Sequence, residues 1–354
     1  MNYKEGLLSI VIPVFNVHDY MVETLNSITG QTYTNWELLL VDDGSTDGSL
    51  DIAKVYCAKD KRIHLYERDR LPKGAPTCRN IGFENAQGEY LIYLDSDDII
   101  APYCFQQRVD YIKANDCDFA VFPMMGFYET MFDARGMLYG YKPQGDNVCA
   151  LLARTLPFVV VTNIYKRQSL VDKKIVWDTN LKSYQDSDYN LQAIRAGLSY
   201  KISNAKPDYF YRLSAQNSIC KKLATASNCE SQIGFIEKQT QLYGGSRANR
   251  LALKVCAAQI YWNIIRVKDN KDITSKFVGI KLFDGKPLFK WRIKMASLLA
   301  TIISKESMYD LIQILLTPGF YLRFRFCYRK WNKYNIKGYN ELKEKYKVEL
   351  NNIF

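Results

Sequence analysis

Residues 89–98 read EYLIYLDSDD, an apolar, strand-like run that ends in a cluster of acids. The apolar run predicts a buried β-strand over 89–94. Asp95, Asp97 and Asp98 follow it directly, and carboxylates this close repel one another unless a cation compensates their charge. A bound cation explains the cluster, and the alternative interpretation is a polar turn that caps the next helix.

The same order of strand and acid occurs earlier in the chain. Residues 8–14 (LSIVIPV) predict a strand that is buried on both faces, and 37–41 (ELLLV) predict a second one that runs into Asp42 and Asp43. Helical patterns follow these strands, and this alternation predicts an α/β fold with a mostly parallel sheet. Ligands of such sheets bind at the carboxyl ends of the strands, where these acids lie.

The D-x-D spacing of Asp95 and Asp97 favours a metal site. Side-chain direction repeats every second residue of an extended chain, so both carboxylates can face the same side. Mg²⁺ and Mn²⁺ are commonly held by one or two carboxylates together with substrate phosphates. We therefore expect Asp95 and Asp97 to bind Mn²⁺ or Mg²⁺, and these ligands do not distinguish the two ions.

Four segments in order carry a resemblance to a known family: SIVIPVFN (9–16), SITGQTYTNWELLLVDDGSTDGS (27–49), CRNIGFENAQGEYLIYLDSDD (78–98) and YQDSDYNLQAIRAG (184–197). Over these segments the chain resembles the inverting glycosyltransferases of family 2, of the bacterial surface-polysaccharide type, which have the GT-A fold. The resemblance implies metal-dependent transfer of a hexose or N-acetylhexosamine from a nucleotide-diphosphate sugar, with UDP the favoured nucleotide. The implied acceptor is a hydroxyl of a lipid-linked glycan in capsule or O-antigen synthesis.

The resemblance also implies roles for residues that surround the donor. Pro13 and Phe15 would lie in the loop around the nucleotide base, and Asp43 would accept a hydrogen bond from the base or ribose. Arg212 matches a stretch that closes over the donor diphosphate, where it would pair with phosphate; an exposed surface arginine is the alternative.

Further donor-binding residues are implied close to the D-x-D motif. Arg79 and Asn80 match an Ala-Arg-Asn segment in which Cys78 takes the place of Ala. Arg79 offers a planar cation suited to a diphosphate or to the acidic cluster itself. Asp95 would contact the ribose or the metal shell, and Asp97 would hold the metal that bridges the diphosphate.

The general base is implied at the start of a helix. The family presents Glu-Asp there, and this chain has Gln185 and Asp186. Asp186 is our candidate to take the proton from the acceptor hydroxyl, and Asp188 is its competitor. In a helix the two side chains are separated by about 200°, so only one of them is expected to face the acceptor. Either one is alternatively a helix N-cap.

The chain divides into two parts by composition. Residues 1–220 hold the motifs and are expected to form the GT-A catalytic domain, and residues 221–354 form a helical, basic and aromatic region. Within the latter, 320–337 carries six basic residues and no acidic one. Three interpretations compete: an anionic membrane surface, a nucleic acid, and helices that pack on the catalytic domain. We favour the membrane surface, where each basic residue contributes about 1 kcal/mol, and nucleic acid is the least favoured.

Charge, cysteine content and hydropathy predict where in the cell the protein is located. The formal net charge of +11 favours anionic partners. The nine cysteines form no C-x-x-C pair, which favours a reducing compartment. The N-terminal residues lack the pattern of a signal peptide, and no apolar run reaches the ~18 residues of a membrane span. The expected location is the cytoplasm, peripheral on the inner face of the cytoplasmic membrane.

Other functions remain as alternatives. A nucleotidyltransferase needs a Gly-rich basic loop after the first strand, and a dehydrogenase needs G-x-G-x-x-G there, whereas this chain has PVFNVHDY (13–20). A non-catalytic membrane or nucleic-acid adaptor on a degenerate GT-A fold is the remaining alternative. An adaptor of this kind is expected to bind membranes normally even when the carboxylates of Asp97 and Asp186 are removed.

Overall fold

The computed structural model describes residues 3–127, 138–139, 147–154, 158–213, 223–267 and 270–295, the last range with breaks at 286, 289, 292 and 294. The predicted domain boundary near residue 220 and the basic stretch 320–337 lie outside these described residues. Among the described residues, no helix is both long and apolar enough to cross a membrane.

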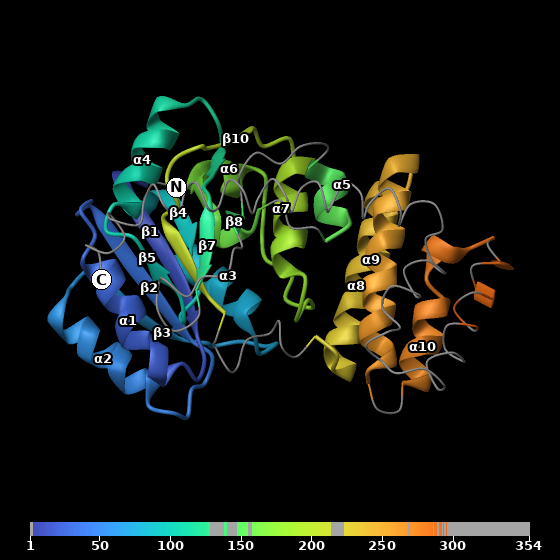
Figure 1. Cartoon of the computed structure of the whole chain (residues 1–354). Helices are drawn as coiled ribbons and strands as arrows, with labels where there is room; N and C mark the ends of the chain where they lie inside the picture. Colours follow the sequence, from blue (N-terminus) through green and yellow to red (C-terminus); the bar gives the residue numbers. More distant parts are fainter. Residues whose placement is uncertain are drawn as a thin grey trace.

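The central layer is a seven-stranded sheet (Figure 1). Its strands are β1 (Lys4–Val14), β2 (Trp36–Asp42), β3 (Ile63–Glu67), β4 (Gly88–Tyr93), β6 (Phe119–Val121), β9 (Asn163–Lys166) and β10 (Tyr200–Ile202). Their spatial order is β10-β6-β9-β4-β1-β2-β3, and β9 alone among them runs antiparallel to its neighbours. The predicted mostly parallel α/β sheet is confirmed.

Helices cover this sheet and continue beyond it. They are α1 (His18–Thr29), α2 (Ser49–Lys59), α3 (Ala75–Asn85), α4 (Cys104–Ala114), α5 (Asn147–Leu152), α6 (Arg167–Asp172), α7 (Gln185–Arg195), α8 (Ala226–Tyr243), α9 (Arg247–Ile265) and α10 (Lys271–Val278). Short 3₁₀ turns lie at η1 (Val160–Thr162) and η3 (Lys281–Phe283).

The apolar strands are buried on both faces, as their sequences predict. In β1, Ile10 and Ile12 belong to the hydrophobic cluster that includes α1 and α4. Val11 points to the opposite face, into a second cluster that includes α7, α8 and α9. This alternation is the period-two direction of strand side chains, and it explains why these strands read as continuous apolar runs.

A smaller sheet lies at the end of the central one. It consists of β5 (Ile99–Ile100), β7 (Met124–Phe127), β8 (Leu138–Tyr139) and β11 (Tyr209–Arg212), in the order β5-β11-β7-β8. Because β5 follows Asp98 directly, this sheet supports the acidic loop after β4 from the side of β11.

The helices after residue 223 pack directly against the rest of the chain. In Figure 1, α8 and α9 lie as long helices beside α5 and α7. One hydrophobic cluster contains Leu91 of β4 together with Ile236 of α8 and Leu253 of α9. The described part of this helical region therefore shares a core with the sheet.

Candidate active site

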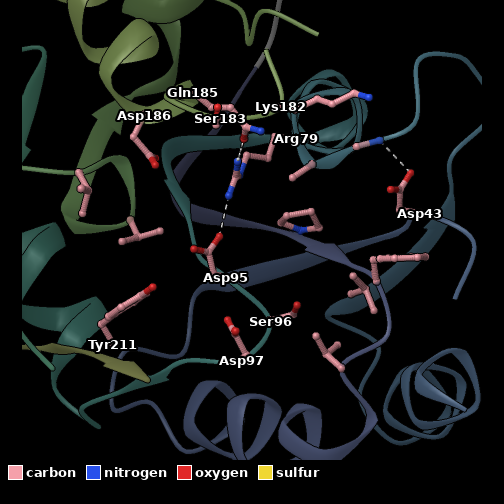
Figure 2. Close-up of a pocket in the computed structure, with 18 of the residues that line it drawn as sticks. Asp43, Arg79, Asp95, Ser96, Asp97, Lys182, Ser183, Gln185, Asp186 and Tyr211 are labelled. Carbon is pink, nitrogen blue, oxygen red and sulfur yellow. Dashed lines mark hydrogen bonds and ion pairs between the residues drawn. The ribbon is translucent and has the colours of Figure 1, made fainter. Parts of the chain in front are cut away.

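A pocket of about 460 Å³ opens at the carboxyl edge of the central sheet. Its lining includes Pro13 at the end of β1, Asp43 after β2, Asp95 and Asp97 after β4, and Asp186 in the first turn of α7. In Figure 2 the carboxylates of Asp186 and Asp97 point into the cavity from opposite sides. The fold therefore brings the predicted acids of three separate segments into the lining of one pocket.

The acidic loop after β4 is anchored by β11. Asp98 is buried; its Oδ1 accepts the backbone N–H of Arg212 at 2.7 Å, and its Oδ2 accepts the Tyr209 hydroxyl. Arg212 Nε donates to the carbonyl of Asp97 at 2.8 Å, and its Nη2 donates to Glu23. Arg212 is buried and is absent from the pocket lining. In the structure Arg212 thus holds the loop, and its expected pairing with donor phosphate stays a prediction.

Asp97 is the pocket-facing carboxylate of that loop. It forms no ion pair within 4.0 Å with any residue in the described ranges. Burial, and then the neighbouring charge of Asp95, raise the pKa of Asp97 to about 6. A half-buried carboxylate with a like charge beside it favours a cation.

The pair of Asp95 and Asp97 fits a Mg²⁺ or Mn²⁺ ion. Such ions take one or two protein carboxylates and complete their shell with phosphate oxygens and water. Within the part of the chain that the structure describes, no group of three or more His, Cys, Asp or Glu side chains forms a metal cluster. Among the described His, Cys, Asp and Glu side chains, a metal ion here would thus be held by this pair.

Arg79 of α3 joins the acidic loop to α7. Its Nη2 donates to Asp95 Oδ1 at 2.6 Å, and its Nη1 donates to Gln185 Oε1 at 3.0 Å, as the dashed lines of Figure 2 show. The guanidinium carbon lies 4.4 Å from the centre of the Trp177 ring. α3 approaches β1 so closely that a Cβ on Gly82 would lie 2.3 Å from Cγ1 of Val11, and this close packing places Arg79 at the strand ends.

Asn80 lies outside the pocket lining. Its Nδ2 donates to the carbonyl of Trp177 at 2.9 Å, and its Oδ1 accepts the N–H of Trp177 at 2.9 Å. Neighbouring helical residues point about 100° apart, so Arg79 and Asn80 cannot both face the pocket. Asn80 holds the backbone of Trp177, whose ring contacts the guanidinium of Arg79, and the expected contact of Asn80 with the donor stays a prediction.

Asp186 and Asp188 lie in different environments, as their helical spacing predicts. Asp186 lines the pocket; burial raises its pKa, and the positive charges of Arg79 and Arg154 oppose that rise. Asp188 is buried and accepts hydrogen bonds from three side chains of α7 and α8: Gln192 at 2.7 Å, Lys238 at 2.9 Å and Gln239 at 2.8 Å. Of the two acids, only Asp186 lines the pocket.

Asp43 and Phe15 form another part of the pocket wall. Asp43 Oδ1 accepts a hydrogen bond from Arg68 Nε at 2.6 Å and another from the N–H of Gly74 at 3.2 Å. Phe15 is 44% exposed, and Lys73 Nζ lies 3.7 Å from the centre of its ring. An exposed aromatic face beside a fixed carboxylate suits a planar ring that carries hydrogen-bond donors.

Sequence reasoning missed several lining residues. Arg154, Lys182, Tyr184 and Tyr211 line the pocket, yet none was assigned a role. Arg154 follows a short helix that carries no motif, and no sequence signal singles it out. Tyr184 stands in one of the four matched segments, where its position just before Gln185 was the available signal.

Comparisons with known proteins agree with this geometry. The sequence model described as Glycosyl transferase family 2 matches residues 9–172. Glycosyltransferase GlyG of Streptococcus pneumoniae serotype 4 is 34% identical over 143 residues, which is 40% of this chain and 46% of that protein. The poly(ribitol-phosphate) beta-glucosyltransferase of Bacillus spizizenii is 31% identical over 210 residues, which is 58% of this chain and 32% of that protein. The chain thus spans less than half the length of these two relatives.

A solved structure shares the fold. The crystal structure of S. aureus TarS 1-349 in complex with UDP-GlcNAc matches with a TM-score of 0.56 at 17% identity, over 97% of this chain and 92% of that one. Similarity at this level concerns the arrangement of the elements. The sequence match over 9–172 includes the strand ends that carry Asp43, Asp95 and Asp97. The residues that line the pocket at these strand ends therefore lie in the part of the chain that is similar to glycosyl transferase family 2.

Proposed function

We propose that the chain is a metal-dependent, inverting glycosyltransferase that moves a hexose or N-acetylhexosamine from a UDP-sugar to an acceptor hydroxyl. The observation that carries the proposal is the meeting of Asp43, Asp95, Asp97 and Asp186 in one pocket. These positions match the family motifs for donor, metal and base. The S. aureus TarS structure with the same fold holds UDP-GlcNAc, which supports UDP as the nucleotide.

The reaction proposed is a single displacement at the anomeric carbon. The acceptor oxygen forms a bond to that carbon while its proton passes to the carboxylate of Asp186. The bond between the anomeric carbon and the donor diphosphate breaks, and the nucleoside diphosphate leaves with the electron pair. Attack from the face opposite the leaving group converts an α-linked donor into a β-linked product.

The donor end of the pocket is assigned to the remaining motif residues. Pro13 and Phe15 border the base, and Asp43 accepts a hydrogen bond from the base or ribose. Asp95 and Asp97 would hold Mn²⁺ or Mg²⁺, which supplies positive charge against the diphosphate when bound. Arg79 fixes Asp95 in place from behind, since its guanidinium is committed to Asp95 and Gln185.

The acceptor is proposed to be a lipid-linked glycan of a bacterial surface polymer. A relative is named as a glucosyltransferase of poly(ribitol-phosphate), a polymer with many hydroxyls. Docking of the basic stretch 320–337 on an anionic membrane at the cytoplasmic face would bring the enzyme to such an acceptor. This part of the proposal is tested by co-sedimentation of the whole chain with vesicles that contain anionic lipid.

Donor hydrolysis is the first test of the function. Purified protein is incubated with UDP-, GDP- and dTDP-sugars and Mn²⁺, and the released nucleoside diphosphate is measured. One UDP-sugar is expected to be hydrolysed slowly, and the release should stop with EDTA and fall about 10²–10³-fold in Asp97→Asn. The matched control is Asp116→Asn, the same chemical change at a fully exposed aspartate, which should leave the rate unchanged.

If no donor is hydrolysed, the enzyme can still require its acceptor for turnover, and nucleotide binding is then tested by calorimetry. Binding of UDP, GDP and dTDP is measured with Mn²⁺ and with EDTA. Metal-dependent binding of UDP supports the proposal even without hydrolysis. No metal-dependent binding of any of the three nucleotides overturns it and leaves the non-catalytic adaptor.

A further inference from the structure

We propose that Arg154 is a positioning residue for Asp186, and that Arg154 and Arg79 together clamp the first turn of α7 from two sides. The inference rests on the proposed role of Asp186 as the base. It concerns a residue outside all the matched motif segments, in a part of the chain between η1 and α5.

Arg154 reaches α7 through two contacts that flank Asp186. Its Nη1 donates to Ser187 Oγ at 2.5 Å, and its guanidinium carbon lies 4.0 Å from the centre of the Tyr184 ring. Arg154 itself has a φ of 60°, in the left-handed region that residues other than glycine rarely adopt. A backbone held in such a conformation indicates that surrounding contacts determine where this side chain goes.

Arg79 holds the same turn from the other side through Gln185 Oε1 at 3.0 Å. Residues 184, 185 and 187 therefore each contact an arginine, and Asp186 lies among them. Tyr184 also has a left-handed backbone, with a φ of 66°. The helix start is thus fixed by side-chain contacts, and the carboxylate of Asp186 is left to point into the cavity (Figure 2).

The two arginines differ in how their charge is used. Arg79 is ion-paired with Asp95 at 2.6 Å. Arg154 forms no ion pair with any residue in the described ranges, and its Nε is buried without a hydrogen-bond partner there. Its positive charge is therefore not neutralised by a described acid, and it acts on Asp186 in the turn that Arg154 contacts. The charged and titratable groups that act on Asp186 are Arg79 from α3, Arg154, Asp95 and Tyr165 of β9.

Gln185 fits this clamp better than a glutamate would. A carboxylate at 185 would compete with Asp95 for Arg79 and would place another negative charge beside Asp186. The neutral amide gives Arg79 an acceptor without either effect. The departure from the Glu-Asp pattern thus leaves the positive charge of the clamp available to Asp186.

Helix α9 packs against the segment that carries Arg154. α5, which leads into Arg154, packs against both α7 and α9. Gln259 of α9 donates its Nε2 to the carbonyl of Ala153 at 3.3 Å, and Cys149 of α5 contacts Asn249 at 3.3 Å. Residues after 223 thereby help to set the position of Arg154 and, through it, of Asp186.

The test compares Arg154→Gln and Arg154→Lys with the unaltered chain by the pH dependence of kcat and KM, in the reaction identified by the donor panel. Arg154→Gln should lower kcat about 10-fold or more with little change in the donor KM, because a small misplacement of a catalytic group is costly. Loss of the positive charge should also raise the pKa of Asp186 and move the acid limb of kcat to higher pH. Arg154→Lys keeps the positive charge but loses the planar guanidinium. The acid limb of kcat should therefore lie at the pH of the unaltered chain, and kcat should lie between the values of Arg154→Gln and the unaltered chain.

Controls separate this inference from the proposed function. Arg195→Gln removes an exposed arginine of the same helix and should change neither parameter. Ser187→Ala removes the hydrogen-bond partner and should lower kcat in the same direction, which keeps the test usable if Arg154→Gln does not fold. If Asp186→Asn retains full activity, the base assignment fails. If Asp186→Asn is inactive while Arg154→Gln keeps the kcat and acid limb of the unaltered chain, the positioning inference alone is overturned.

Discussion

The loop after β4 and the first turn of α7 each contain a buried acid that is held by hydrogen bonds and an acid that faces the pocket. The loop also contains Asp95, which lines the pocket and is ion-paired with Arg79. In the loop, Asp98 is anchored by Tyr209 and by the backbone of Arg212, and Asp97 faces the cavity. In α7, Asp188 is anchored by Lys238 and Gln239, and Asp186 faces the cavity. In both regions a buried, hydrogen-bonded acid lies next to or near an acid that faces the pocket, but the charges around the pocket-facing acid differ.

The difference lies in the charge around the acid that faces the pocket. Asp97 has the carboxylate of Asp95 beside it and no ion pair with a described residue, and the charge of Arg212 offsets the rise of its pKa only in part. Asp186 lies near the guanidinium groups of Arg79 and Arg154. A carboxylate with a like charge beside it suits a metal site, whereas one beside two guanidinium groups suits a base, because their positive charges oppose the rise of its pKa on burial. Each region is thus expected to respond differently when its acid is neutralised.

The largest effect is expected from Asp186→Asn. Loss of a general base costs about 10²–10⁴-fold in turnover, and the amide cannot take the acceptor proton. The metal-dependent affinity for UDP should stay within a few-fold, because the donor end of the pocket is unaltered. Rate assays and calorimetry on the same preparation check this, and turnover within 10-fold of the unaltered chain would contradict the assignment.

Asp188→Asn makes the same chemical change two residues away. It is expected to lower the stability of the fold and to leave turnover unchanged. Three donors converge on Asp188, and an amide offers one oxygen and places its NH₂ group against a donor. Burial raises the pKa of Asp188, so relief of a buried charge offsets part of the loss. The free energy of unfolding should fall by about 1–2 kcal/mol, measured in urea, with turnover per folded molecule unchanged. A large loss of turnover with full stability would instead make Asp188 part of the chemistry.

The smallest effect is expected from Asp97→Asn in metal-free protein, and it is a gain in stability. The pKa of Asp97 is about 6 in the folded chain against an ordinary 3.8, so the folded state favours the protonated form. That contribution to stability is present below pH ~4 and is lost as the pH rises through about 6. At pH 7–8 the amide should therefore raise the Tm by a few degrees, or about 1 kcal/mol after allowance for partial exposure.

The gain should vanish at pH 4, and added Mn²⁺ with UDP should reverse the order by stabilising only the unaltered chain. Scanning calorimetry at pH 4 and pH 7.5, with and without these ligands, measures each comparison. A Tm that is lowered at pH 7.5 in the metal-free protein would show that Asp97 has a cation partner of its own.

The sites that could be predicted from sequence are those that local pattern determines. Asp43 and Asp97 follow apolar runs that predict buried strands, and the carboxyl ends of parallel strands lie on the same edge of the sheet. Asp186 and Asp188 could be separated in advance because the helical period turns them to different sides. The contacts of Asn80 and Arg212 could not be predicted, since their partners Trp177, Asp97 and Glu23 are distant in sequence.

The sequence by itself determined the α/β alternation, the buried strands and the acids at their carboxyl ends, because periodicity and the energetics of burial act over a few neighbouring residues. Only the tertiary structure decided which of these acids face the pocket and which are held by hydrogen bonds to other described side chains. It also placed Arg154 against the first turn of α7 and Arg212 against the acidic loop. Charge pairing depends on distances between segments far apart in the chain, and those distances exist only once the core has packed.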